Sequence, residues 1–226
     1  MTKFTAAAKC CLCAETFKGA GISTHLKKHL EVISKVPVIK QKKTMLHIKV
    51  SSGPAYFLHL LMPANLLFGK FDTFLRGIWL ECCGHMSEFM IDREKISMKK
   101  QLGNVLTVGE TIHYLYDFGT TTELDIKLVN SYEMELKPDY AKEITILAQN
   151  EPYTFKCVSC GKVATQICSQ CQYEIDNPFY CDECAEDEEK HACGESEMCL
   201  SVSNSPRMGL CAYEGEDRKF KLVNLS

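Results

Sequence analysis

The feature that most constrains this chain is a dense series of cysteines between residues 157 and 193. Three Cys-x2-Cys pairs precede one His-x-Cys pair, and each Cys-x2-Cys pair lets two thiolates face one ion from a tight turn. The stretch 182–190 is mostly acidic and cannot form an apolar core, so metal must supply the folding free energy, on the order of 10 kcal/mol per zinc ion. The eight predicted ligands, enough for two tetrahedral zinc ions, are Cys157, Cys160, Cys168, Cys171, Cys181, Cys184, His191 and Cys193.

The aromatic-cysteine step at Tyr180-Cys181 makes this series resemble the cross-brace zinc fingers of the MYND and HIT types. In that arrangement the first and third pairs share one ion, and the second and fourth pairs share the other; the resemblance also implies docking of a protein partner. A sequential arrangement, in which the first two pairs share an ion, is the alternative. The last His and Cys lie closer together than in MYND fingers, so Cys199 or Cys211 is an alternative to Cys193.

The N-terminal stretch 10–29 contains a second ligand pattern, formed by a Cys-x2-Cys pair and a His-x3-His pair. Two His at i and i+4 share one face of a helix, which suits a tetrahedral zinc site. With Phe17 and Ile22 as small core residues, the stretch resembles a C2H2 zinc finger that lacks one residue between them, and Cys11 is a spare cysteine that could compete with Cys10. The predicted ligands are Cys10, Cys13, His25 and His29, which brings the expected total to about three Zn²⁺ ions.

Several bulk features indicate a cytoplasmic protein. No apolar run approaches the ~20 residues that a transmembrane helix needs, and the N-terminus lacks the apolar segment of a signal peptide. In a reducing compartment the 14 cysteines favour metal binding over disulfides. A thioredoxin-like redox role is disfavoured because no strand-helix unit carries a Cys-x2-Cys pair.

The charge is unevenly distributed, with +8 over residues 1–50, −4 over 51–150 and −7 over 151–226. The basic end predicts nonspecific contact with nucleic-acid phosphates. Sequence-specific reading is disfavoured: the base-contacting positions of such a finger fall at Lys18, Gly21 and Thr24, and Gly19 and Gly21 weaken the helix and offer no base contact. A solvated basic linker or a protein contact is the alternative. The predicted phosphate contacts are Lys18, Lys27, Lys28, Lys42 and Lys43 within a run that also includes Lys35 and Lys40.

The middle of the chain alternates apolar and polar residues as half-buried strands do. A helix is expected over 64–80 with Asn65 as its N-cap. Strands are expected over 44–50, 55–62, 85–91, 111–118, 122–136 and 143–149. The fold class is therefore α+β, a central mixed sheet with one main helix, flanked by the N-terminal finger and the C-terminal two-zinc module.

Within residues 44–148 this order of elements, together with Trp79, His85 to Phe89 and Tyr-Asp-Phe-Gly at 116–119, resembles the plasmid pRiA orf-three-like family, also known as TnpR-like passenger proteins of insertion elements. The family form continues with Gly-Asp, but Thr120 follows Gly119 here, so the resemblance implies a fold and no reaction. The chain shows no serine nucleophile or arginine cluster that would support recombination.

Candidate catalytic groups in the middle domain are few. The candidates are His85, Glu88, His113 and Asp117. His113 and Asp117 are expected on one strand face, whereas no nearby acid is expected on the face of His85. A structural role is favoured for these groups, core packing for Cys82 and Cys83, and a structural turn over anion binding for Arg207. Since every predicted ion is fully ligated by protein and a catalytic zinc keeps an open position, the zinc sites are expected to be structural.

The sequence therefore predicts a non-enzymatic zinc-binding adaptor or regulator that contacts nucleic acid at its N-terminal end and a protein through its C-terminal module. A pure protein-interaction protein, or an enzyme that uses the middle domain, is the alternative. The predicted parts are a finger (1–32), a basic linker (33–43), the α+β domain (44–150), the double-zinc module (151–213) and a tail (214–226).

Overall fold

A computed structural model describes residues 6–19, 21–36, 42–137, 140, 143–215 and 221–225. Part of the predicted basic linker (37–41, with Lys40) and part of the tail (216–220 and 226) lie outside these residues. The described helices are α1 (Gly21–Ser34), α2 (Phe68–Leu75), the π-helix η1 (Arg76–Leu80), α3 (Asp182–Ala185), and the 3₁₀ turns η2 (Leu102–Asn104), η3 (Cys171–Tyr173) and η4 (Ser196–Met198). The strands are β1 (Ala7–Cys10), β2 (Thr16–Lys18), β3 (Lys43–Ser52), β4 (Tyr56–Pro63), β5 (Ser87–Ile91), β6 (Glu94–Ile96), β7 (Thr111–Tyr116), β8 (Thr122–Met134), β9 (Thr145–Asn150), β10 (Gln166–Cys168), β11 (Phe179–Tyr180) and β12 (Cys199–Ser201).

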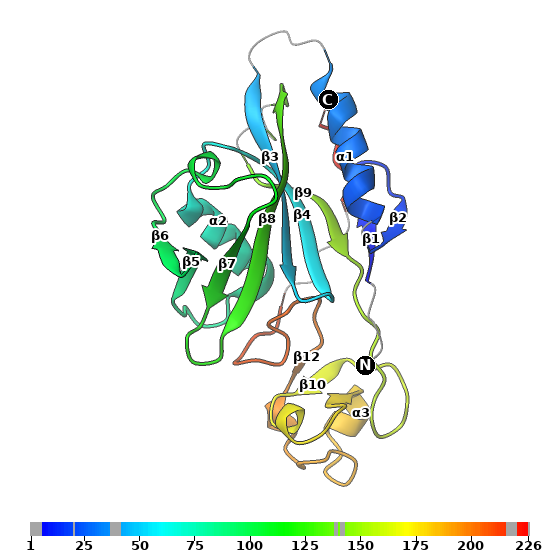
Figure 1. Ribbon diagram of the computed structural model, residues 1–226. Coiled ribbons are helices and arrows are strands. Elements are labelled where there is room, and N and C mark those ends of the chain that lie inside the picture. The colour runs from blue at the N-terminus through cyan, green and yellow to red at the C-terminus, as the bar shows by residue number, and fades with distance from the viewer. Residues whose placement is uncertain are drawn as a thin grey trace.

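The centre of the molecule is a nine-stranded sheet in the order β2-β1-β9-β4-β3-β8-β7-β5-β6 (Figure 1). Every pairing described in it is antiparallel, so the α+β class is confirmed and the expectation of a mixed sheet is wrong. Parallel pairs need long crossovers, whereas β3–β4, β5–β6 and β7–β8 are joined by short turns, which give antiparallel neighbours.

The two main helices cover opposite faces of this sheet. Alternate residues of β3 and β4, such as Ile48 and Leu60, pack with Phe71 of α2 in one core. The residues between them, such as Leu61, pack with Leu26 of α1 in a second core. Because successive side chains of a strand point to opposite faces, one hairpin contributes to both cores.

The N-terminal unit belongs to the central sheet. Strand β1 pairs with β9 and with β2, so this unit extends the sheet edge, in contrast to the predicted finger that stands beside the domain. Three apolar residues of α1 are at most 1% exposed and pack against the sheet, namely Ile22, Leu26 and Leu30. The unit therefore buries the predicted core residue Ile22, together with Leu26 and Leu30, which the sequence pattern did not indicate.

The second helix starts later than predicted. Helix α2 begins at Phe68 with Leu67 at the N-cap and no side-chain cap, so Asn65 does not cap it. The free N–H groups of the first turn instead donate to the carbonyls of Lys100 and Met98, 3.0 and 2.8 Å away. Past Leu75 the helix widens into the π-helix η1, which buries Trp79 before the chain turns out toward solvent at residues 81–86.

The C-terminal module lies beyond one end of the sheet (Figure 1). Its three strands pair in the order β11-β10-β12. Its buried cluster consists of cysteines apart from Tyr180 and Ala185. This module therefore lacks the aliphatic core that supports the rest of the protein. No helix in the described part of the chain is long and apolar enough to cross a membrane.

Residues 203–213, called the strap below, connect the module back to the sheet. The Ser205 hydroxyl donates to the carbonyl of Trp79 at 2.6 Å, and the fully buried Arg207 donates to Asp117 at 2.5 Å. Arg207 also donates to the carbonyl of Thr120 at 2.5 Å. Arg207 thus has the structural role that was favoured over anion binding.

Two buried histidines face each other on the α1 side of the sheet. Nε2 of His47 lies 3.0 Å from Nδ1 of His59, and both side chains are at most 1% exposed. Burial lowers the pKa of His47 to about 4. The pKa of His59 is also lowered, mainly by burial and to a smaller extent by the neighbouring His47. Both imidazoles are therefore neutral in the folded protein at neutral pH.

This pair makes folding acid-sensitive. Above the unfolded pKa of about 6.5 both states are neutral, but as the pH falls from there toward about 4 only the unfolded state takes up protons, which costs about 1.4 kcal/mol of stability per histidine per pH unit. We expect the double variant His47→Leu, His59→Leu to lose less stability between pH 7 and 5 than the wild type, measured by urea unfolding with excess zinc. The exposed His113→Gln serves as control; equal pH slopes in wild type and double variant would refute the assignment.

Candidate metal centres

The described residues form four Cys/His tetrads whose ligand atoms lie within 4.8 Å of one another. Each tetrad could hold a metal ion, and the ligand types are compatible with zinc. Three tetrads consist of the residues that the sequence predicted, and the fourth joins residues that it did not connect. Their names and members are the N-terminal tetrad (Cys10, Cys13, His25, His29), the four-cysteine tetrad (Cys157, Cys160, Cys181, Cys184), the cysteine-histidine tetrad (Cys168, Cys171, His191, Cys193) and the bridging tetrad (Cys82, Cys83, His85, Cys211).

The N-terminal tetrad brings a β-hairpin and one face of α1 together. Cys10 ends β1, and the N–H of Leu12 points at its sulfur at 3.4 Å, while Sγ of Cys13 lies 3.2 Å from Nε2 of His25. Burial and the neighbouring His29 lower the pKa of His25, which favours the neutral imidazole that binds metal.

The spare Cys11 lies outside this tetrad. Its N–H donates to the carbonyl of Leu147 in β9 at 2.8 Å, which turns the residue toward the sheet. Burial raises the pKa of Cys11 to about 11. The structure therefore groups Cys10, and not Cys11, with the other three ligands.

The four-cysteine tetrad combines the first and third Cys-x2-Cys pairs. Sγ of Cys160 lies 3.6 Å from Sγ of Cys181, close to the separation of about 3.8 Å between two sulfurs on one tetrahedral zinc. Burial opposes ionisation of Cys157, but hydrogen bonds from the backbone N–H groups of Cys181 and Cys160 outweigh it and lower the pKa of this thiol to about 6. The thiolate, which is the metal-binding form, is thus accessible at neutral pH.

The cysteine-histidine tetrad combines the second and fourth pairs, so the structure groups the ligands in cross-brace fashion and not sequentially. Sγ of Cys193 lies 3.7 Å from Sγ of Cys168 and 3.6 Å from Nε2 of His191. Cys199 lies beside this tetrad, with its sulfur 3.9 Å from Nε2 of His191, whereas Cys211 belongs to the bridging tetrad. Of the three cysteines considered for the last ligand, the structure groups Cys193 with the other ligands, places Cys199 close to them, and places Cys211 in another tetrad.

The bridging tetrad lies at the surface between the sheet and the strap. Cys83 and Cys211 are exposed, and Cys82 and His85 are partly buried, so the expectation of core packing is wrong for Cys83. The adjacent Cys82-Cys83 followed by His85 was the available sequence signal. Cys211 lies 126 residues beyond His85, and spacing alone cannot connect such distant positions.

The other candidate groups of the middle domain do not form one site. His113 is exposed on β7 and lies 3.1 and 3.0 Å from Glu123 and Asp125 of β8. Asp117 leaves the strand with φ of 64° and pairs with Arg207 and, at 3.4 Å, with His85. The expectation that His113 and Asp117 share a face is therefore wrong, and so is the view that His85 has no acid near it; Glu88 pairs with Lys95 at 3.2 Å.

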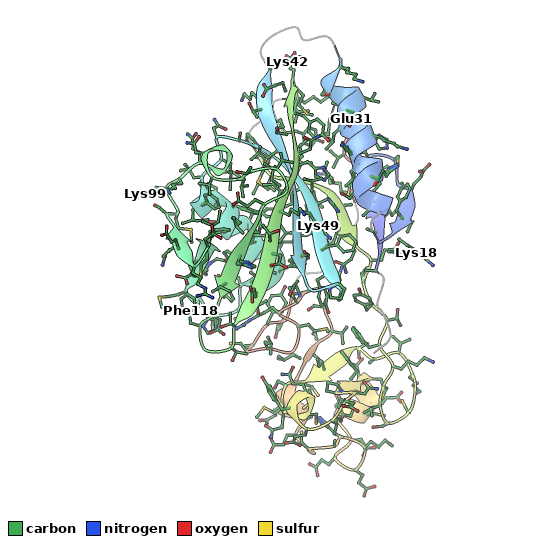
Figure 2. All side chains as sticks on the ribbon, viewed as in Figure 1. Lys18, Glu31, Lys42, Lys49, Lys99 and Phe118 are labelled. Carbon is green, nitrogen blue, oxygen red and sulfur yellow. The ribbon has the colours of Figure 1, made fainter. Side chains whose placement is uncertain are left out.

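The predicted phosphate contacts are all exposed. Figure 2 shows Lys42 just before β3 and Lys18 at the end of β2, toward opposite ends of α1. Lys27 lies 4.0 Å from Glu31 on α1, so its charge is partly compensated there. The five lysines thus form a spread basic surface along α1, not a narrow groove.

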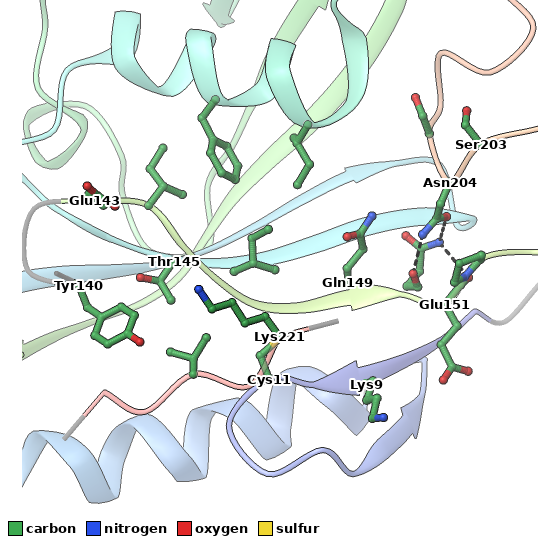
Figure 3. Close-up of a pocket in the computed structure, with 18 of the residues that line it drawn as sticks. Lys9, Cys11, Tyr140, Glu143, Thr145, Gln149, Glu151, Ser203, Asn204 and Lys221 are labelled. Atoms are coloured by element: carbon green, nitrogen blue, oxygen red, sulfur yellow. Dashed lines mark hydrogen bonds between the residues drawn. The ribbon is translucent and has the colours of Figure 1, made fainter. Parts of the chain in front are cut away.

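A cavity of about 880 Å³, which the sequence pattern did not indicate, opens between β1, β9 and the strap (Figure 3). Asn204 of the strap spans one end of it by exchanging hydrogen bonds with Asn150 at 2.8 Å each. Side chains of both charge signs line the cavity: Lys9 and Lys221 are basic, and Glu143 and Glu151 are acidic. Its residues come from five separate segments, so no local pattern could have marked it.

No protein-family model matches the chain, and no curated protein matches it. Among solved structures, the chain is similar to the crystal structure of a protein of unknown function, MM3350, from Methanosarcina mazei Go1. The two are 17% identical with a TM-score of 0.35, over 42% of this chain and 64% of that one. The chain thus spans less than two thirds of that protein's length.

Proposed function

We propose that this protein is a non-enzymatic zinc-binding adaptor. The observation that carries the proposal is the interleaved grouping of the first with the third and the second with the fourth ligand pairs in the C-terminal module. Eight sulfur and imidazole groups gather there into two sets, in a segment whose buried cluster is made mainly of those same cysteines. Thiolate and imidazole ligands in sets of four suit Zn²⁺.

The proposed ions are structural. A catalytic zinc keeps one coordination position for water or substrate, whereas each tetrad offers four protein ligands to its ion. The proposed role is therefore to fix surfaces that partners recognise. The sheet domain, for which we keep the proposed kinship with the pRiA orf-three-like family, would serve as the scaffold that connects the two ends.

We further propose that the two ends contact different partners. The exposed lysines along α1 suit the phosphates of nucleic acid without base recognition. The C-terminal module has acidic residues at its surface, such as Glu183 and Glu186, and these repel phosphates, so a protein segment is its proposed partner.

The nucleic-acid part is tested by fluorescence anisotropy with random duplex DNA and single-stranded RNA over a salt series. We expect binding that weakens steeply with salt, and a variant with glutamine at the five lysines should bind more weakly. For duplex DNA, the slope of the logarithm of the binding constant against the logarithm of the salt concentration should be shallower in the variant. The difference should be about 0.9 for each phosphate that the variant no longer neutralises. The variant carries the substitutions Lys18→Gln, Lys27→Gln, Lys28→Gln, Lys42→Gln and Lys43→Gln.

The matched control removes five exposed charges near α2, on the other face of the sheet, and should bind as the wild type does. Absence of binding at low salt, or equally weakened binding in both variants, would favour the pure protein-interaction alternative. The control substitutions are Lys70→Gln, Arg93→Gln, Lys95→Gln, Lys99→Gln and Lys100→Gln.

A further inference from the structure

Four metal-binding side chains that the double-zinc module does not use meet where the strap crosses the sheet domain. Cys82, Cys83 and His85 lie in the loop between η1 and β5, and Cys211 comes from the strap. Their cysteines are free thiols. The bridging tetrad therefore unites two segments that are far apart in the sequence.

The spacing of these atoms suits one tetrahedral zinc ion. With Zn–S of about 2.3 Å and Zn–N of about 2.0 Å, two sulfurs lie about 3.8 Å apart and a sulfur and a nitrogen about 3.6 Å apart. The Sγ atoms of Cys82 and Cys83 are 4.0 Å apart, and those of Cys83 and Cys211 are 3.5 Å apart. Nε2 of His85 lies 3.6 Å from Sγ of Cys211 and 3.0 Å from Sγ of Cys83.

The second nitrogen of His85 gives an independent indication. Nδ1 lies 3.4 Å from Oδ1 of Asp117, which leaves Nε2 facing the sulfurs. A histidine that binds metal typically donates its other N–H to a carboxylate, and this contact fixes the ring and its tautomer. Asp117 is itself held by Arg207 and by the N–H of Gly119 at 3.0 Å.

The loop that carries three of the ligands is fixed by further contacts. Arg76 donates to the carbonyl of His85 and, at 2.6 Å, to Glu81. Glu81 accepts the N–H of Gly84 at 2.6 Å, and Gly84 has a φ of 83°, a conformation that favours glycine. The ligands are thus oriented by the chain around them.

Charge and ligand type suit a zinc ion. Three thiolates and one neutral imidazole around Zn²⁺ give a net charge of −1, and Nη2 of Arg207 lies 3.7 Å from Sγ of Cys82. Soft sulfur ligands select zinc over magnesium or calcium, which prefer oxygen. Arg207 thereby compensates the charge of the tetrad as well as that of Asp117.

We propose that Cys82, Cys83, His85 and Cys211 bind a fourth Zn²⁺ that fastens the strap to the sheet domain. This site extends the proposed zinc binding, but it differs in role from the other three. It joins two parts that are already folded, and two of its ligands are exposed, so its ion should exchange with solvent and chelators before those of the C-terminal module.

Native mass spectrometry of the full chain tests the proposal. The wild type should carry four zinc ions, and the double variant Cys83→Ser, Cys211→Ser should carry three with an unchanged far-UV circular dichroism spectrum, because both side chains are exposed. His113→Gln, which changes an exposed histidine outside the tetrads, should keep four. In hydrogen exchange, the amides of the strap should exchange faster in the double variant, while those of β3 and β8 stay protected.

The outcomes separate this proposal from the proposed function. Three ions in both the wild type and the double variant would overturn the fourth site and leave the other three intact. A disulfide between Cys83 and Cys211 would also overturn the fourth site. It would appear as a wild-type mass that is lower by two hydrogens, that reduction restores, and that the double variant does not show. Fewer than three ions in the wild type would contradict the proposed function itself.

Discussion

Replacing Cys184 by serine should unfold the C-terminal module and leave the nine-stranded sheet folded. Five of the seven buried members of the module's core are predicted zinc ligands, so loss of an ion removes the interior itself. Structural zinc contributes on the order of 10 kcal/mol to folding in finger peptides, more than the module can recover from its short strands. Hydrogen exchange should show residues 157–201 losing protection while β3, β4 and β8 keep theirs.

The matched variant His29→Ala removes one ligand from the N-terminal tetrad and should have a much smaller effect. Helix α1 buries Ile22, Leu26 and Leu30 against the sheet, and β1 remains paired with β9, so this unit stays docked without its ion. Limited proteolysis should therefore cut Cys184→Ser within the module and leave α1 of His29→Ala intact. Equal protection of the module in Cys184→Ser and the wild type would show that zinc does not support its fold.

Replacing Arg207 by methionine should destabilise the protein by about 3–5 kcal/mol, because it leaves the Asp117 carboxylate in a buried site without its cation. The Arg207 side chain is fully buried and donates to Asp117 and to the Thr120 carbonyl, both at 2.5 Å. Urea unfolding of the sheet domain with excess zinc measures the change, and Arg93→Met, at an exposed position, serves as control.

A second substitution separates charge from packing. In the Arg207→Met background, Asp117→Asn removes the uncompensated charge and keeps a residue that tolerates the φ of 64°. We expect part of the stability to return. If Asp117→Asn further destabilised the Arg207→Met protein, the ion pair would not be the source of the effect.

The local parts of this structure were predictable because their signals are short-range. Ligand spacing identified the members of three tetrads, since Cys-x2-Cys and His-x3-His place their atoms within one turn. The alternation of apolar residues located β3, β4, β7 and β8 to within a few residues. These elements depend on neighbours in the sequence and little else.

The parts that were missed depend on tertiary contacts. The pairing of β1 with β9 joins residues about 140 positions apart, so the N-terminal unit could be read only as a separate finger. The bridging tetrad needs Cys211 beside His85, and the buried ion pair needs Arg207 beside Asp117; both follow from the course of the strap. The late start of α2 also depends on tertiary contacts, because the carbonyls of Met98 and Lys100 accept the N–H groups of Gly69 and Phe68.

The central claim is that these tetrads bind zinc through their own sulfurs and nitrogens, and X-ray absorption at the zinc edge of the purified protein tests it most directly. The three predicted tetrads together offer nine sulfurs and three nitrogens, so the average ion should have three sulfurs at about 2.3 Å and one nitrogen at about 2.0 Å. The bridging tetrad has the same ratio, so occupancy of the fourth site does not change this expectation. A first shell dominated by oxygen and nitrogen, or one with five or six ligands, would contradict the account.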